Sequence, residues 1–113
     1  MEPLQRLDTQ MMISLKELLS ENFDLLVNTF VSDGNERLGR LNKGIKNNDF
    51  KLVRMEAHAL KGSSRNIGAV GFANLCAEIE NQARDNNGAG LYKKFLTIES
   101  EFHLLSVEVK QFL

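Results

Sequence analysis

Proline is nearly absent from this chain, because Pro3 is its single example. Proline is the strongest breaker of helix interiors, so the rest of the chain is free to form long helices. The 17 leucines also outnumber the valines and isoleucines together (11), and such a balance favours helices over strands. The sequence therefore predicts an all-α protein.

Five apolar stretches follow the helical repeat, with apolar positions spaced by three or four residues. They cover residues 7–18, 22–47, 49–66, 72–86 and 91–112. Asp49 is a good N-terminal cap for the third stretch, and Gly68 follows it where a left-handed residue is expected. Short connections favour antiparallel neighbours, so we expect an antiparallel four-helix bundle with an additional short N-terminal helix packed across it. No linker or repeat interrupts residues 1–113, which predicts a single domain.

Three details of packing can be predicted from the same pattern. The first helix should bury one face made of Leu7, Met11, Leu15 and Leu18. The middle of the second helix is weakened by three glycines, Gly34, Gly39 and Gly44. A bend or break is expected there unless packing requires small residues at these positions. Cys76 lies among apolar residues at helical spacing and should be a small buried hydrophobe rather than a reactive thiol.

Length and charge exclude several functions. With 113 residues, the chain is too short for a self-sufficient ATP-dependent kinase or a dinucleotide enzyme. Its 14 basic and 15 acidic side chains give a net charge of -1, which provides no general attraction to nucleic acid or to anionic lipid. Residues 1–6 lack the apolar core of a signal peptide, and no apolar run could span a bilayer. We therefore expect a cytoplasmic protein that binds neither membrane nor nucleic acid.

One polar helix face combines a histidine with several cations. At about 100° per residue, five positions fall within roughly 60° of His58 around the helix axis: Lys51, Arg54, Lys61, Gly62 and Arg65. The opposite face carries the apolar residues Val53, Leu60 and Ile67. His58 is therefore expected to be exposed rather than part of the core.

This arrangement suits phosphoryl chemistry. An exposed imidazole is largely uncharged at neutral pH and can act as a nucleophile toward phosphorus. A phosphoryl group on His58 would lie within reach of Lys61, one helical turn further on. Gly62 has no side chain to obstruct another protein whose reacting atom must approach the ring.

The run His58–Ala69, including the string HALKGSS, followed by Leu75–Glu80, resembles the signature of histidine-containing phosphotransfer (HPt) domains. The resemblance implies that His58 is phosphorylated on a ring nitrogen and exchanges the group with a receiver aspartate. It also implies that Lys61 assists the phosphoryl charge and that Gly62 clears space for the receiver. Glu80 matches a family position that faces the histidine, where a carboxylate could orient the imidazole but would also repel a phosphoryl group. A solvated Glu80 without a role is the alternative.

The resemblance further implies a stand-alone member of a bacterial-type two-component phosphorelay. Its partners would be the receiver domain of a response regulator and a hybrid sensor histidine kinase. The chain has no glycine-rich phosphate loop and no acidic pair for magnesium, so we expect a relay intermediate without its own kinase, cofactor or metal. Whether such an intermediate counts as an enzyme stays open. The expected docking face for the receiver consists of the cationic residues around His58, which are Lys51, Arg54 and Arg65. Met55 and Ala59 lie at its edges.

Other interpretations are weaker. A non-phosphorylated helical adaptor that binds receiver domains is the main alternative. A metal-binding bundle is disfavoured, because neither His58 nor His103 has a glutamate three residues earlier. His103 is expected to be a flanking residue of the last helix. Glu56 points toward the core side of its helix, which suggests an interhelical hydrogen bond. Nothing in the sequence demands more than a monomer.

Overall fold

The computed structural model describes residues 6–113. Pro3 therefore lies outside the described residues, as do most of residues 1–6, on which the prediction about a signal peptide was based. The described chain forms five α-helices and one short 3-10 helix, η1, without any strand. The elements are α1 (Thr9–Leu19), η1 (Ser20–Asn22), α2 (Phe23–Lys46), α3 (Phe50–Asn66), α4 (Val70–Arg84) and α5 (Leu91–Lys110). The all-α prediction is confirmed.

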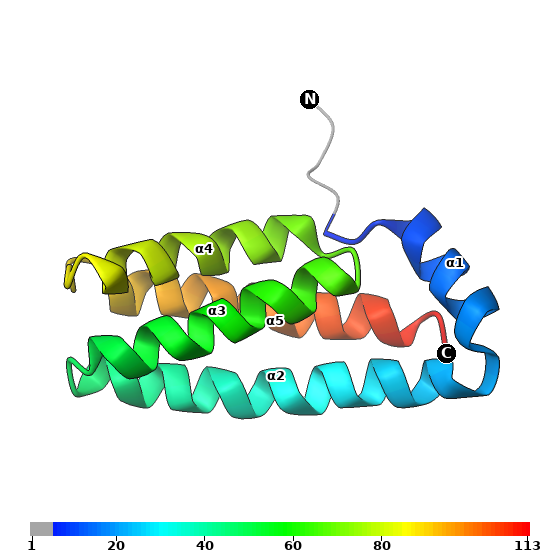
Figure 1. Cartoon of the computed structure of the whole chain (residues 1–113), viewed down its shortest axis with the longest axis horizontal. Helices are drawn as coiled ribbons and strands as arrows, with labels where there is room; N and C mark the ends of the chain where they lie inside the picture. The colour runs from blue at the N-terminus through cyan, green and yellow to red at the C-terminus, as the bar shows by residue number, and fades with distance from the viewer. Residues whose placement is uncertain (1–5) are drawn as a thin grey trace.

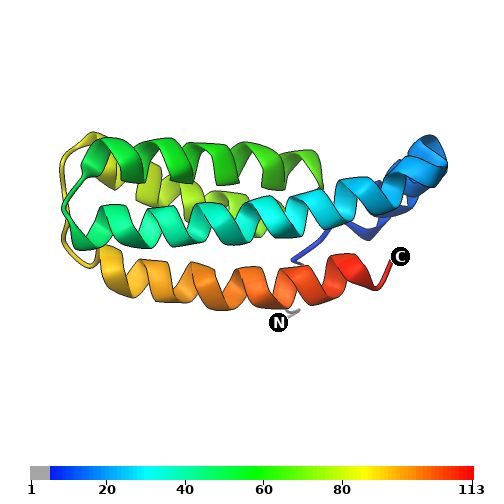
Figure 2. The ribbon, with the colours of Figure 1, turned by 90° about the horizontal axis from the view of Figure 1, so that it is seen from below.

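Helices α2 to α5 form an antiparallel four-helix bundle. Contacts run between α2 and α3, α3 and α4, α4 and α5, and α5 and α2, so the four helices close a ring around one core (Figures 1 and 2). Helix α1 lies across the end of the bundle where α2 begins and α5 ends (Figure 1). Lys16 of α1 donates to the carbonyl oxygen of Phe112 at 2.6 Å and so ties α1 to the segment that follows α5.

A polar cap and a left-handed glycine mark the two ends of α3. The Asp49 carboxylate accepts a hydrogen bond from the backbone N–H of Leu52 at 3.1 Å, as expected for the N-terminal cap of α3. Gly68 adopts a left-handed φ of +84° between α3 and α4, which confirms its predicted role at the helix end. Its carbonyl oxygen accepts from the backbone N–H of Asp8 at 3.0 Å, so this turn also holds the segment that leads into α1.

The buried face of α1 differs in part from the predicted one, because Leu7, just before the helix, and Leu15 do pack into the core. Leu18 is 79% exposed, whereas Met12 is fully buried. The helix packs through Met12, Leu15 and Leu19, which share one face at spacings of three and four residues. The sequence has two adjacent apolar pairs here, Met11–Met12 and Leu18–Leu19. Two apolar faces of the helix therefore fit the sequence equally well, and tertiary packing determines which one is buried.

Helix α2 runs through its three glycines as one continuous helix, so the break considered at the level of sequence does not occur. A β-carbon at Gly34 would come within 2.1 Å of the Phe102 ring of α5. A β-carbon at Gly44 would come within 3.0 Å of the Val53 side chain of α3. Gly34 is therefore required by the close approach of α5 to α2, and Gly44 by the close approach of α3 to α2. Gly39 would meet nothing within 4 Å, and no internal contact explains it.

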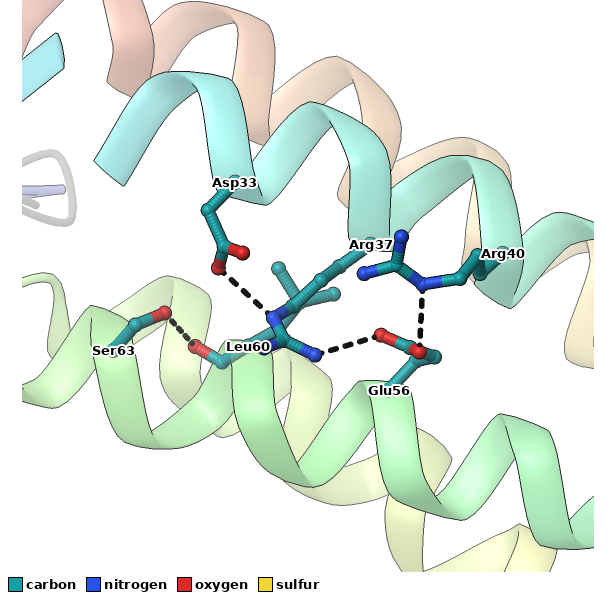
Figure 3. A network of polar contacts seen from close by, with 6 residues as sticks. All are labelled: Asp33, Arg37, Arg40, Glu56, Leu60 and Ser63. Carbon is teal, nitrogen blue, oxygen red and sulfur yellow. Dashed lines mark hydrogen bonds and ion pairs between the residues drawn. The ribbon is translucent and has the colours of Figure 1, made fainter. Parts of the chain in front are cut away.

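An ion network centred on the buried Glu56 joins α2 to α3. The Glu56 carboxylate lies almost fully inside the protein and accepts from Arg37 at 3.0 Å and from Arg40 at 2.8 Å (Figure 3). Arg37 is held in turn by Asp33, one turn earlier on α2, at 2.9 Å. Both oxygens of Glu56 are thus engaged by residues of α2, which is the interhelical hydrogen bonding that its position on the helix suggested. The network links α3 to α2 through charge-assisted hydrogen bonds.

Candidate functional site

His58 stands on the outer side of α3, and its side chain is 69% exposed. The apolar residues Val53, Leu60 and Ile67 face the core on the other side of the helix, as the periodicity predicted. Nδ1 of the His58 ring lies 2.7 Å from Oε2 of Glu80, which belongs to the neighbouring helix α4. One edge of the imidazole is therefore fixed by the protein, while most of the ring faces solvent.

Glu80 is buried, with only 6% of its side chain exposed. Its second oxygen, Oε1, accepts a hydrogen bond from Nζ of Lys61 at 2.5 Å. Burial is the largest single influence on the Glu80 carboxyl and raises its pKa. Hydrogen bonds from Lys61 and then His58, together with their positive charge, outweigh burial and bring the pKa below the usual 4.5. Glu80 is therefore a buried but charged carboxylate at neutral pH.

This charge determines the chemistry of the imidazole. A carboxylate can only accept hydrogen bonds, so the 2.7 Å contact places a proton on Nδ1 of His58. In the neutral ring, Nε2 then carries the lone pair and is the nucleophilic nitrogen. The site thus holds one imidazole in a defined tautomer, with its reactive nitrogen free of that contact.

Lys61 is less accessible than the helix pattern suggested, because its side chain is only 18% exposed. Its ammonium group balances the charge of Glu80 instead of extending freely beside the histidine. Gly62 is exposed, and a β-carbon there would meet nothing within 4 Å. No contact inside the protein therefore requires glycine at position 62, although a glycine weakens a helix interior by roughly 1 kcal/mol relative to alanine.

The remaining predicted residues form the rim of the site. Lys51, Arg54 and Arg65 are exposed on α3, and within residues 6–113 none of them forms an ion pair. Met55 is 54% exposed and Ala59 is half-buried beside them. These three cations are thus exposed on the helix that carries His58, and none of them is a hydrogen-bond partner of its ring.

Other candidates lie elsewhere. His103 is exposed on α5, in a groove of about 420 Å³ between α2 and α5. Cys76 is fully buried, as predicted, and burial followed by the nearby Glu80 charge raises the pKa of its thiol to about 12. Among the residues that the structure describes, no three His, Cys, Asp or Glu side chains are grouped to bind a metal ion. None of the described helices has the length and apolarity needed to cross a membrane.

The contact between Lys61 and Glu80 was missed at the level of sequence, although a signal for the burial of Glu80 was present. Glu80 follows the buried Cys76 by four residues and precedes the buried Ala83 by three, so it belongs to the apolar stripe of α4. A glutamate in such a stripe requires a partner, since an isolated buried charge is costly. The exposed cations of α3 gave no reason to select Lys61 as that partner.

Comparison with known proteins agrees with this geometry. A family model described as "Hpt domain" matches residues 25–107. The chain is similar to the crystal structure of histidine-containing phosphotransfer protein B (HptB) from Pseudomonas aeruginosa PAO1, with 33% sequence identity and a TM-score of 0.91. The match covers 96% of this chain and 95% of that chain. A search of curated proteins found no match.

Proposed function

Since this chain belongs to the Hpt domain family and so has a histidine phosphotransfer role in a phosphorelay, we propose that His58 carries the phosphoryl group. The observation that carries this assignment is the contact between His58 and Glu80. It fixes the imidazole with Nε2 as the nucleophile, while the ring stays 69% exposed and accessible to another protein. His103, the other histidine, has no such carboxylate contact within the described chain.

Phosphoryl transfer at this site consists of two exchanges with receiver domains. His58 accepts the group from a phosphorylated receiver aspartate, such as that of a hybrid sensor histidine kinase. It then passes the group to the receiver aspartate of a response regulator. The receiver supplies the acidic pocket and its metal ion, while this chain supplies the nucleophile.

Three residues near His58, namely Lys61, Glu80 and Gly62, assist the transfer. Lys61 offsets negative charge at the site, both that of Glu80 and that of an arriving phosphoryl group. Glu80 orients the His58 ring. Gly62 leaves the space above α3 open, so that a receiver can bring its aspartate close to Nε2.

The cationic rim serves as the docking face. Lys51, Arg54 and Arg65 are exposed and unpaired within the described residues, and their charge complements an acidic receiver pocket. Met55, which is exposed at the edge of this face, adds apolar contact area.

Transfer between purified proteins tests this proposal. A receiver phosphorylated on its aspartate should lose its label to this protein, and a second receiver should remove the label again. If the receivers bind but no label ever moves, the protein is a non-phosphorylated adaptor instead. Binding is measured in the same samples by fluorescence anisotropy, so the two functions give different results.

A further inference from the structure

The outward face of α5 carries apolar side chains that do not contribute to the core of the bundle. Four large side chains of this helix are 41–50% exposed: Tyr92, Leu96, Leu104 and Val107. The outer side of a helix in a monomeric bundle is normally polar. We propose that two copies of this chain pair through α5 and the adjoining groove of α2, with the two α5 helices antiparallel about a two-fold axis.

Six exposed residues of α5 recur at spacings of three and four and therefore share one face of the helix. This pairing stripe consists of Tyr92, Leu96, Glu99, His103, Val107 and Lys110. Among the described residues, its charged and titratable members Glu99, His103 and Lys110 form no ion pair. The stripe thus offers both apolar area and unused polar groups to a partner.

The order of residues along the pairing stripe fits a second copy that runs in the opposite direction. In one antiparallel register, the stripe meets itself in three complementary pairs: Leu96 opposite Val107, Glu99 opposite His103, and Tyr92 opposite Lys110. The midpoint of each pair lies at or next to Glu101, so a single two-fold axis there relates all three pairs. Each pair then occurs twice, as a two-fold interface requires. This self-complementarity identifies the partner as a second copy of the chain.

Each pair has a physical reason to form. The aliphatic pair removes apolar surface from water, which is the main favourable contribution to association. The Glu99 carboxylate accepts a hydrogen bond from an imidazole N–H of His103 in the other copy. The Lys110 ammonium group lies against the Tyr92 ring in a cation–π contact. Since the polar pairs form only in this register, they also fix how the two helices align.

The groove beside the stripe provides room for the second copy. It has a volume of about 420 Å³ and lies between α2 and α5, which run side by side in Figure 2. Gly39 lines this groove on α2 and leaves it open, whereas a long side chain there would fill it. Asn42 also lines the groove, and its buried Oδ1 has no hydrogen-bond partner in the described part of the chain. This face therefore retains an acceptor for a donor from outside the chain.

Pairing through this face leaves the histidine site accessible. Helix α5 packs against α2 and α4 and lies across the bundle from α3, which carries His58. His58 contacts Glu80 on the side of α3 and α4, whereas the groove lies on the side of α2 and α5. The pair thus presents two exposed histidines on its outer sides, and each can meet a separate receiver.

Analytical ultracentrifugation of the whole protein over a range of concentrations tests the pairing. The average mass of wild type should rise from that of one chain toward that of two. Leu96→Asp places a charge in the centre of the stripe and should raise the dimer Kd at least about tenfold. Met55→Asp is the matched control, because it changes an exposed apolar residue of α3 and should leave the Kd unchanged. Wild type that stays monomeric up to about 1 mM, or equal Kd values in all three proteins, would overturn the proposal.

A charge exchange tests the register and does not depend on the fold of any single variant. Glu99→Lys places a lysine opposite His103, and His103→Glu places two glutamates opposite each other. Each variant alone should therefore dimerise at least about tenfold more weakly than wild type. A mixture of the two restores both contacts, so mixed dimers should form with a Kd close to that of wild type. Mixed dimers no stronger than those of the separate variants would contradict the antiparallel register.

This inference stands apart from the proposed function. Leu96→Asp should accept and pass on the phosphoryl group as wild type does, because Leu96 lies on the other side of the bundle from His58. Loss of dimers with normal transfer supports the pairing and leaves the proposed function intact. A protein that dimerises through α5 but never carries a phosphoryl group would reject only the proposed function.

Discussion

His58 and Glu80 belong to different helices, yet Nδ1 of the histidine and Oε2 of the glutamate lie 2.7 Å apart. The glutamate is charged although it is buried, because Lys61 binds its other oxygen. This contact links the stability of the bundle to the chemistry of the exposed ring. It also makes the electrostatics of the site measurable without a partner protein.

Acid should weaken the fold in part through Glu80. Its pKa in the folded protein lies below the usual 4.5, so its stabilising contribution is present above about pH 4.5 and is lost as pH falls through the folded value. The free energy of unfolding, measured by urea titration at several pH values, should therefore fall less toward acid in Glu80→Gln than in wild type. Parallel pH profiles would show that Glu80 does not contribute in this way.

The Glu56 network should stabilise the pairing of α2 with α3. Glu56→Ala leaves Arg37 and Arg40 without their buried partner and should lower the free energy of unfolding by about 2–3 kcal/mol. Glu36→Ala, which removes an exposed carboxylate of α2, is the control and should change stability by at most about 0.5 kcal/mol. Similar small effects in both variants would indicate that the network is not important for folding.

Two glycines of α2 should respond in opposite ways to alanine. Gly34→Ala places a methyl group against the Phe102 ring and should destabilise the protein by about 1–3 kcal/mol. Gly39→Ala adds a methyl group in open space and should stabilise the helix by about 0.5–1 kcal/mol. Thermal unfolding followed by circular dichroism distinguishes the two. If both variants shifted stability equally, α5 would not approach α2 as closely as described.

Gly62 should matter for partner binding rather than for folding. Gly62→Gln adds a side chain where the protein itself leaves open space, so helix content should be retained while affinity for a receiver falls at least tenfold. Gly39→Gln is the matched control, because that glycine is also exposed within a helix, but on α2 and in the groove between α2 and α5. Comparable loss of binding in both variants would contradict a specific role for Gly62.

Much of the fold could be predicted from the helical repeat and a few capping residues. The order of the helices, the cap at Asp49 and the turn at Gly68 follow from local rules, and the structure confirms them. The buried face of α1 could not be chosen, because Met11 and Met12 offer two equivalent stripes. The need for Gly34 could not be predicted either, since it depends on Phe102, a residue far along the chain.

The site was predictable to a similar degree. A helical projection was enough to place His58 on an exposed face and to collect its neighbours on α3. The ionisation of Glu80 could be inferred only from the three-dimensional structure, because it depends on the burial of the carboxylate and on its contacts with residues of α3. The same holds for Lys61, which the sequence presented as a free cation and the structure shows bound to Glu80.

Identification of the phosphorylated residue tests the central claim most directly. The protein is incubated with a receiver carrying labelled aspartyl phosphate, and the label is then examined for stability in acid and alkali in wild type, His58→Gln and His103→Gln. Wild type and His103→Gln should carry one acid-labile, alkali-stable phosphoryl group, and His58→Gln should carry none. Label that persists in His58→Gln, or disappears only in His103→Gln, would contradict the assignment of His58 as the phosphoryl carrier.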